Sequence, residues 1–308
     1  FALATVGFAS SNSLYDSLLV DVTTPERYDQ VSAYGFALGY IGGALLFTLN
    51  VVMVSSPETF GLADAGQAVR WSFISVAVWW LVFTLPLIWW VHESPSATPP
   101  AGEALRAGMR ELLGTLRALR GQRDVWLFLI AYWLYIDGVY TIIKMAVDFG
   151  MALGLTTQDL ILAILITNYV GFPAALVFGA LGRRYGPRAG LYLSLSVYIL
   201  ATIAASFITT ERDFYVLAVC IGLVQGGVQS LSRSLFARLI PPGKTGEYFG
   251  FYNMLGKFAA IIGPILVGVV ALWSGSQRIG LLSILVLFVI GLGLLTQVRA
   301  GAAAGETA

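Results

Sequence analysis

The sequence predicts an all-α polytopic membrane protein, from its composition, the length of its apolar runs and the charges between those runs. Hydrophobic residues make up 57% of the 308 residues and charged residues only 11%, and the mean hydropathy is +0.80. A soluble domain carries about 25% charged residues. Most side chains are therefore expected to face a lipid bilayer.

The apolar runs give nine candidate membrane spans. A spanning helix needs about 20 mainly apolar residues, and such runs cover residues 1–20, 31–54, 71–91, 125–149, 159–181, 188–208, 214–236, 248–273 and 278–298. The runs are uniformly apolar and not alternating, which disfavours transmembrane strands. Because the sequence opens at Phe1, inside an apolar run and without a basic segment, we expect an N-terminal truncation and no signal peptide.

The loops between the runs alternate in charge. If the loop after the first run is cytoplasmic, that side holds twelve basic residues, namely Arg27, Arg106, Arg110, Arg117, Arg120, Arg123, Arg183, Arg184, Arg188, Arg238, Lys244 and Arg299. The other side holds Arg70, Arg212 and Arg278. The positive-inside rule then predicts a cytoplasmic C-terminus. Arginine outnumbers lysine fifteen to three, a bias that hints at a bacterial genome, so we expect a bacterial plasma membrane.

The composition also disfavours several classes of function. The net charge of +1 gives no reason to expect a nucleic-acid partner. One cysteine, Cys220, and one histidine, His92, rule out a disulfide framework or a Cys/His zinc site within the sequence. Since the sequence also lacks a nucleophile–base pattern, we predict no enzyme activity, no metal and no cofactor.

One long connection divides the sequence. It opens with a Pro-rich stretch at 94–100, which cannot hold a helix. Residues 103–120 then place leucines on one face and arginines off that face, which predicts an amphipathic helix on the inner membrane surface. The alternative is a passive linker between two helix bundles. The predicted domains are 1–91 and 125–298, with the connection at 92–124 and a tail at 299–308.

An internal repeat indicates how the spans are organised. The segment from Asn12 to Leu19 aligns with Gln229 to Phe236, and Pro25 falls on Pro242 without a gap. The first and second runs thus correspond to the seventh and eighth, and the repeat unit is six helices. Such repeats are typical of secondary transporters. Nine helices make one and a half units, so a complete first unit requires three more helices in front.

The loop after the fifth run resembles the major facilitator signature Gly-x-x-x-Asp-Arg-x-Gly-Arg-Arg. Gly179, Arg184, Gly186 and Arg188 match it, whereas Arg183 occupies the position of the Asp. Longer stretches, at 31–43, 135–138, 225–236 and 250–257, resemble the vacuole-effluxer-like branch of the major facilitator superfamily. The resemblance spans the whole sequence. It implies helices four to twelve of a twelve-helix fold and a gradient-driven transporter, with amino-acid efflux known for the fungal vacuolar members.

Six charged residues fall inside the predicted spans, where a charge costs about 2.5–3.5 kcal/mol: Asp16, Asp137, Lys144, Asp148, Arg233 and Lys257. Three of them, Asp137, Lys144 and Asp148, share one stripe of the fourth run, and Lys144 can pair with Asp148. Burial favours the protonated form of a lone carboxylate, so Asp137 is a candidate for proton exchange. The alternative is that it accepts hydrogen bonds from a neighbouring helix, purely for packing.

The eighth run holds a second group of candidates. Lys257 can bind an anionic group of a solute, or its long side chain can extend toward the membrane surface. Asn253, and Gln229 on the seventh run, can line the same cavity or bond neighbouring helices. We also expect Gly263-Pro264 to kink the eighth helix.

The repeat places Asp16 and Arg233 at equivalent positions and at the same depth in two helices. We hypothesise that they form an inner-gate ion pair, made when the cytoplasmic side is closed; the alternative is separate partners in each bundle. The leading interpretation is a monomeric secondary active transporter that moves a small solute by alternating access. The rival is a non-transporting membrane sensor or lipid-handling protein on the same fold.

Overall fold

The computed structural model describes residues 2–91, 104–241 and 243–299, and every regular element in these ranges is helical. Helices are favoured because a bilayer offers no water to unpaired backbone groups. Eight helical stretches are long and apolar enough to cross a membrane: Pro25–Ser55, Ala65–Trp90, Arg123–Ala152, Thr157–Tyr185, Pro187–Ala205, Glu211–Leu239, Thr245–Ser274 and Gln277–Gln297. The protein is therefore a multi-pass integral membrane protein.

The first half of the chain forms three long helices with short links. Its elements are α1 (Ala2–Ser17), α2 (Leu19–Val22), the 3-10 turn η1 (Pro25–Arg27), α3 (Tyr28–Ser55), the 3-10 turn η2 (Pro57–Phe60) and α4 (Ala65–Trp90). Asp64 starts α4 because its carboxylate accepts a hydrogen bond from the backbone N–H of Gln67 at 2.7 Å.

The second half holds the remaining helices. They are α5 (Ala104–Gly121), α6 (Arg123–Ala152), α7 (Thr157–Tyr185), α8 (Pro187–Ala205), α9 (Glu211–Leu239), α10 (Thr245–Phe258), α11 (Ile262–Ser274), α12 (Gln277–Leu282) and α13 (Leu285–Gln297). Capping boxes start α7 and α9, formed by Thr156 with Asp159 and by Thr210 with Asp213.

Three predicted spans differ from the structure. The first, 1–20, is a 16-residue helix that is interrupted at Leu18 and continues as α2. The ninth is interrupted between α12 and α13. The eighth is broken, not kinked, between α10 and α11, and Gly263-Pro264 lies in the first turn of α11, just after the break. The reason for this position is a side chain on another helix, considered below.

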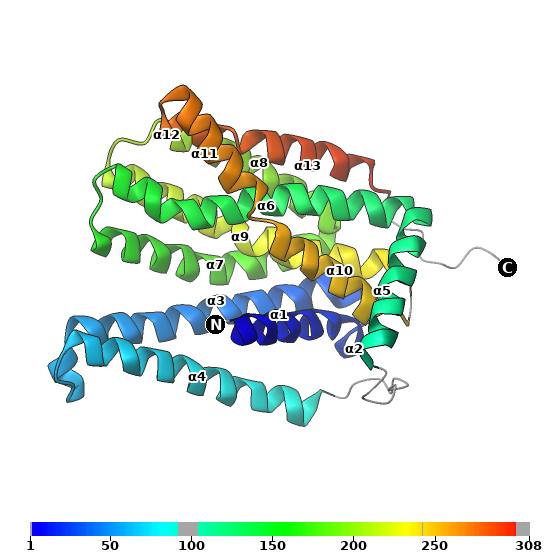
Figure 1. Ribbon diagram of the computed structural model, residues 1–308, viewed down its shortest axis with the longest axis horizontal. Helices are drawn as coiled ribbons and strands as arrows, with labels where there is room; N and C mark the ends of the chain where they lie inside the picture. The colour runs from blue at the N-terminus through cyan, green and yellow to red at the C-terminus, as the bar shows by residue number, and fades with distance from the viewer. Residues whose placement is uncertain (1, 92–103, 242, 300–308) are drawn as a thin grey trace.

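The two halves lie side by side (Figure 1). α1 to α4 occupy one side and α6 to α13 the other, and α3 packs against α7 and α9 of the second half. Most of the buried core belongs to the second half, where aromatic rings of α6, α9 and α10 stack on one another. In contrast, α4 buries only Ala68, as expected of a helix with a wide lipid-facing surface.

The amphipathic segment of the long connection is α5, which lies across one end of the bundle (Figure 1). It is docked there: the buried Thr115 hydroxyl donates a hydrogen bond to the carboxylate of Glu247 on α10, and Leu119 is only 1% exposed. The Pro-rich opening of the connection, up to residue 103, and the tail from residue 300 lie outside the described residues.

Candidate functional site

The two halves approach most closely where small residues of α7 face α3. A Cβ added to Gly179 would lie 2.5 Å from the Cβ of Ala33, and one added to Gly182 would lie 3.1 Å from the Cβ of Asp29. Neither position can hold a larger side chain unless the helices separate. The glycines therefore bring the backbone of α3 within reach of polar groups on the second half.

Arg233 of α9 links the halves through an ion pair. Its Nη1 lies 2.9 Å from Oδ1 of Asp16 on α1, and the side chains are 6% and 16% exposed, respectively. The guanidinium carbon also lies 4.8 Å from the ring centroid of Phe36 and 5.6 Å from that of Tyr15. The repeat-derived pair is thus present in the structure; its role as a gate stays a hypothesis.

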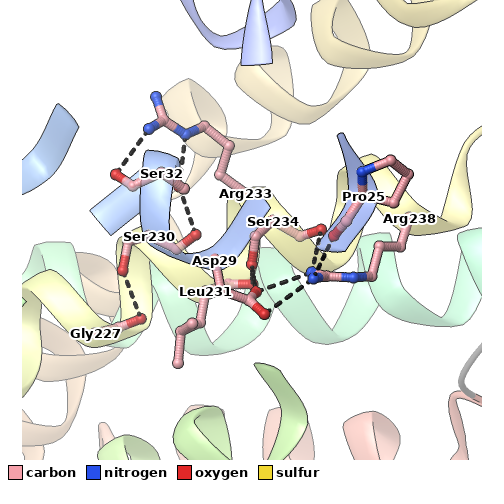
Figure 2. Close-up of polar contacts among 9 residues, drawn as sticks. All are labelled: Pro25, Asp29, Ser32, Gly227, Ser230, Leu231, Arg233, Ser234 and Arg238. Atoms are coloured by element: carbon pink, nitrogen blue, oxygen red, sulfur yellow. Dashed lines mark hydrogen bonds and ion pairs between the residues drawn. The ribbon is translucent and has the colours of Figure 1, made fainter. Parts of the chain in front are cut away.

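Ser32 of α3 completes the environment of Arg233. Arg233 donates from Nε to the Ser32 hydroxyl oxygen and from Nη2 to the Ser32 carbonyl oxygen, both at 2.9 Å. The Ser32 hydroxyl in turn donates to the carbonyl oxygen of Ser230 on α9 at 2.7 Å (Figure 2). All three guanidinium nitrogens of Arg233 are therefore bonded to the first half.

A second ion pair joins the halves one turn away (Figure 2). Arg238 of α9 forms a bidentate contact with Asp29 of α3, with Nη1–Oδ1 and Nη2–Oδ2 distances of 2.9 Å. Arg238 Nη2 also donates to the carbonyl oxygen of Pro25 at 2.8 Å. The Asp29 side chain is 1% exposed and accepts a further hydrogen bond from Ser234. Bidentate, charge-assisted contacts of this kind are among the stronger polar interactions in proteins.

Asp29 also accounts for the departure in the loop signature. Arg183 stands where the signature has an acidic residue, and it is exposed and bonds Gln30 of α3 at 3.4 Å. The carboxylate beside Gly182 is supplied by Asp29 of the other half. Of the matched residues, Gly179 lies in the close contact described above, and Gly186 ends α7 with φ +84°. Arg184 stacks over Tyr185, and Arg188 donates to the carbonyl of Val298.

The three charged residues of the predicted stripe on α6 differ in how far they are buried. Asp137 is 1% exposed, and its carboxylate accepts hydrogen bonds from the backbone of α11, which is the geometry of the packing alternative. Lys144 and Asp148 are exposed. The described residues form two ion pairs, and neither involves Lys144 or Asp148.

The candidates of the seventh and eighth spans also lie apart. Gln229 accepts a hydrogen bond from the Tyr40 hydroxyl of α3 at 2.7 Å, so it bridges the halves. Asn253 donates to the carbonyl of Phe249 within its own helix. Lys257, at the end of α10, is exposed on the side that faces α1, with Nζ 4.7 Å from the ring centroid of Phe8, which is itself 46% exposed.

A partly enclosed cavity of about 150 Å³ lies within the second half, among α6, α7, α8, α9 and α12. Its lining is mainly aliphatic and aromatic, with Thr167, Asn168, Thr202 and Gln225 as the polar side chains. None of the charged candidates lines it, whereas both ion pairs found among the described residues lie between the halves.

Sequence reasoning missed Asp29, Arg238 and Ser32. Asp29 and Arg238 lie at the ends of apolar runs, where charged loop residues are expected. Ser32 belongs to no sequence pattern that would have singled it out. One signal was present: an Arg at the acidic position of the loop signature requires that a carboxylate come from elsewhere.

This arrangement of helices is the major facilitator fold. The structure is similar to the crystal structure of the human organic anion transporter MFSD10 (TETRAN), with a TM-score of 0.59 over 92% of this chain and 67% of that chain. At 15% identity the likeness concerns the fold alone.

The sequence comparisons then show the family. The model of the vacuole effluxer Atg22-like family matches residues 17–307, and the chain belongs to that family. It is 37% identical over 300 residues to the MFS-type transporter YxiO of Bacillus subtilis (strain 168), covering 97% of this chain and 70% of that protein. It is 26% identical to autophagy-related protein 22 of Yarrowia lipolytica, covering 87% of this chain and 50% of the relative. The chain thus spans about half the length of this fungal relative.

Proposed function

We propose that this protein is a secondary active transporter that moves a small solute by alternating access, and that the structure represents the state closed on the side of the basic loops. The observation that carries the proposal is the pairing of charges across the halves. Both ion pairs found in the described ranges join the two halves, and both involve one end of α9. In an alternating-access carrier, contacts of this kind hold one mouth of the pathway shut.

Acidic residues on one half and basic residues on the other also suit a reversible contact. A purely apolar interface would hold the halves together regardless of state, whereas a charge pair can be exchanged for water when the mouth opens. Because each pair is buried, removing only one of its two partners would leave the other charge unpaired, which is costly. We therefore assign Asp16 with Arg233 and Asp29 with Arg238 to the inner gate.

The solute that we propose carries a carboxylate, as amino acids and organic acids do. Lys257 supports this, since it is exposed on the side that faces α1, with an aromatic ring as its contact and no carboxylate partner among the described residues. An ammonium group in such a position can bind an anionic group of a solute, with Phe8 beside it. The membrane would be the bacterial plasma membrane, with the basic loops in the cytoplasm.

The test is a ligand panel on the native gene product. Purified protein in detergent is screened by thermal shift against amino acids and organic acids, and hits are tested for counterflow in proteoliposomes. We expect stabilisation by at least one carboxylate-bearing solute. Lys257→Gln should abolish the shift, while Arg212→Gln, which removes an exposed cation in the first turn of α9, should keep it. Counterflow that is unaffected by Lys257→Gln would remove this residue from the solute site.

The rival function, a non-transporting sensor or lipid-handling protein, makes a different prediction. Such a protein would bind a ligand without moving it across the bilayer. A solute that stabilises the protein but shows no counterflow, while an inner-gate variant leaves binding unchanged, would favour the sensor.

A further inference from the structure

The eighth spanning helix is broken near the middle of its span, Thr245–Ser274, and the break has a defined geometry. α10 ends at Phe258, α11 begins at Ile262, and Ala260 between them has φ +78°. This left-handed backbone conformation is unfavourable for a residue with a side chain. A break that exposes backbone groups and holds an alanine in this conformation requires contacts that compensate for both.

The compensating contacts come from Asp137 on α6. Its Oδ2 accepts the backbone N–H of Ile262 at 3.1 Å, and its Oδ1 accepts that of Gly263 at 2.9 Å. The Thr141 hydroxyl, one turn along α6, donates to the same Oδ1 at 3.2 Å. One carboxylate thus satisfies two of the free N–H groups that start α11, where the helix dipole also favours a negative charge.

Gly263 is required by this contact. A Cβ on Gly263 would lie 1.9 Å from the Thr141 hydroxyl oxygen and 2.7 Å from Asp137 Oδ1. Any side chain here would push α11 away from α6. The fit between Asp137 and Gly263 therefore determines where along the helix the break lies. It does not by itself explain why the helix is broken.

The two sides of the break are held differently. On α10, the ring of Tyr252 stacks on those of Tyr132 and Phe236, with centroid distances of 4.1 Å and 5.0 Å, and Phe249 meets Phe236 edge-on at 5.2 Å. In contrast, α11 buries only Gly263 and Val267, and its main neighbour is α12. α10 is fixed to the core, whereas α11 is held to α6 chiefly at its first turn.

We infer that Asp137 is a positioning residue that acts as a clasp: its carboxylate holds the first turn of α11 against α6, and releasing it lets that turn move about the Ala259–Ile261 joint while α10 stays in place. The clasp itself is independent of what the protein transports. Its use in opening the side opposite the basic loops rests on the proposed function.

The clasp is tested by hydrogen exchange of the native gene product in detergent, resolved to the amides of residues 259–265. In Asp137→Ala the amides of Ile262 and Gly263 should exchange at least tenfold faster than in the wild type. The matched control is Asp64→Ala, which removes a helix cap elsewhere; it should accelerate Gln67 and leave Ile262 and Gly263 unchanged. Unchanged protection of these two amides in Asp137→Ala would overturn the inference.

A milder pair of variants keeps the test decisive if Asp137→Ala does not fold. Thr141→Val removes the hydroxyl that supports Asp137, and Thr202→Val removes a buried hydroxyl that bonds only its own helix at 2.8 Å. Exchange at Gly263 should rise several-fold in the first and not in the second, and equal rates in both would contradict the clasp. Loss of transport in Asp137→Asn with full protection of Ile262 and Gly263 would also overturn it, and would assign Asp137 to proton coupling instead. Absence of transport in the wild type and in both control variants, with the expected exchange, would refute the proposed function and leave the clasp standing.

Discussion

Arg233 makes three kinds of contact at once: an ion pair with Asp16, hydrogen bonds to Ser32 and stacking on Phe36 and Tyr15. A guanidinium can do this because its fork of donors is planar and its faces are weakly hydrated. A lysine would keep the charge but lose both the second set of hydrogen bonds and the stacking. The identity of this residue is therefore set by geometry as much as by charge.

We expect neutralisation of Arg233 to be costly. Arg233→Gln leaves the Asp16 carboxylate partly buried without its partner, and removal of one member of a buried pair costs about 3–5 kcal/mol. Thermal unfolding in detergent should show a clear loss of stability, and the inner side should become more accessible to thiol reagents at engineered cysteines. The double exchange Asp16→Arg, Arg233→Asp should recover part of this loss, because the charges can pair again while the Ser32 contacts cannot.

The control is Arg184→Gln, since Arg184 is exposed and stacks on its own neighbour. An exposed substitution of this kind usually changes stability by no more than about 0.5 kcal/mol. Equal effects of the two substitutions would mean that the Arg233 pair contributes nothing specific.

At the scale of residues, the sequence predicted an ion pair only between the two positions that the internal repeat relates. The alignment of two equivalent helices brought Asp16 and Arg233 together on paper, and they lie 2.9 Å apart in the structure. No such relation connects Asp29 with Arg238, because contacts between different helices at their ends depend on how closely the helices approach. That distance is set by Gly179 and Gly182 on a third helix.

At the scale of elements, the contact of α3 with α7 depends on Gly179. Gly179→Val would place methyl groups where Ala33 lies, so the two helices must separate. We expect a folded protein in which the proposed gate is open, detected as faster labelling of a cysteine introduced at Ala37, which is fully buried beside Ala175 of α7. Gly61→Val serves as a different kind of control, because nothing lies within 4 Å of a Cβ added at this position. The left-handed φ of +69° is unfavourable for valine, so the substitution should lower the stability of the protein without affecting the interface. Slow labelling in Gly179→Val would show that α3 and α7 can adjust without opening the gate.

The docking of α5 can be tested by a pair of leucines. Leu119 is 1% exposed whereas Leu116, on the same helix, is 41% exposed. Leu119→Asp should detach α5 from α6 and α10 and loosen its backbone, so that limited trypsin digestion cuts faster at its arginines, of which Arg110 and Arg117 are already exposed. Leu116→Asp should digest like the wild type. Resistance of both variants would mean that Thr115 and Glu247 suffice to hold α5 in place.

Helices were predicted well where the length of an apolar run is enough to define them. They were predicted less well where a helix is interrupted. The positions of α3, α4 and α6 to α9 follow from runs of apolar residues. The Gly263-Pro264 pair pointed to an irregularity in the eighth span, but the break itself lies at Ala259–Ile261 because Asp137 caps α11 there. A cap supplied by another helix leaves no local trace in the sequence.

For the whole molecule, the orientation in the membrane is a prediction that labelling can check. With Cys220 replaced, a single cysteine at Gly121, an exposed position at the end of α5, should react only from the cytoplasmic side. One at Gln277, exposed at the start of α12, should react only from outside. The physical reason is the excess of basic residues in the loops on the α5 side. Reversed reactivity of both cysteines would overturn the orientation, and reactivity of both from the same side would overturn the count of membrane crossings between them.

Arg233 and Arg238, the arginines of the proposed gate, both belong to α9, which bears on how the gate would open. Arg233 and Arg238 are five residues apart on α9, about 140° apart around its axis, so one reaches α1 and the other reaches α3. If α1 and α3 move as one body, a continuous 29-residue helix cannot move away from one carboxylate by several ångströms and stay beside the other unless it bends. An intermediate in which only one pair is broken is thus unfavourable for two reasons. The helix α9 must bend, and a charged side chain is left without its partner. The transition would be all-or-none, with four charged groups changing their environment in one concerted event.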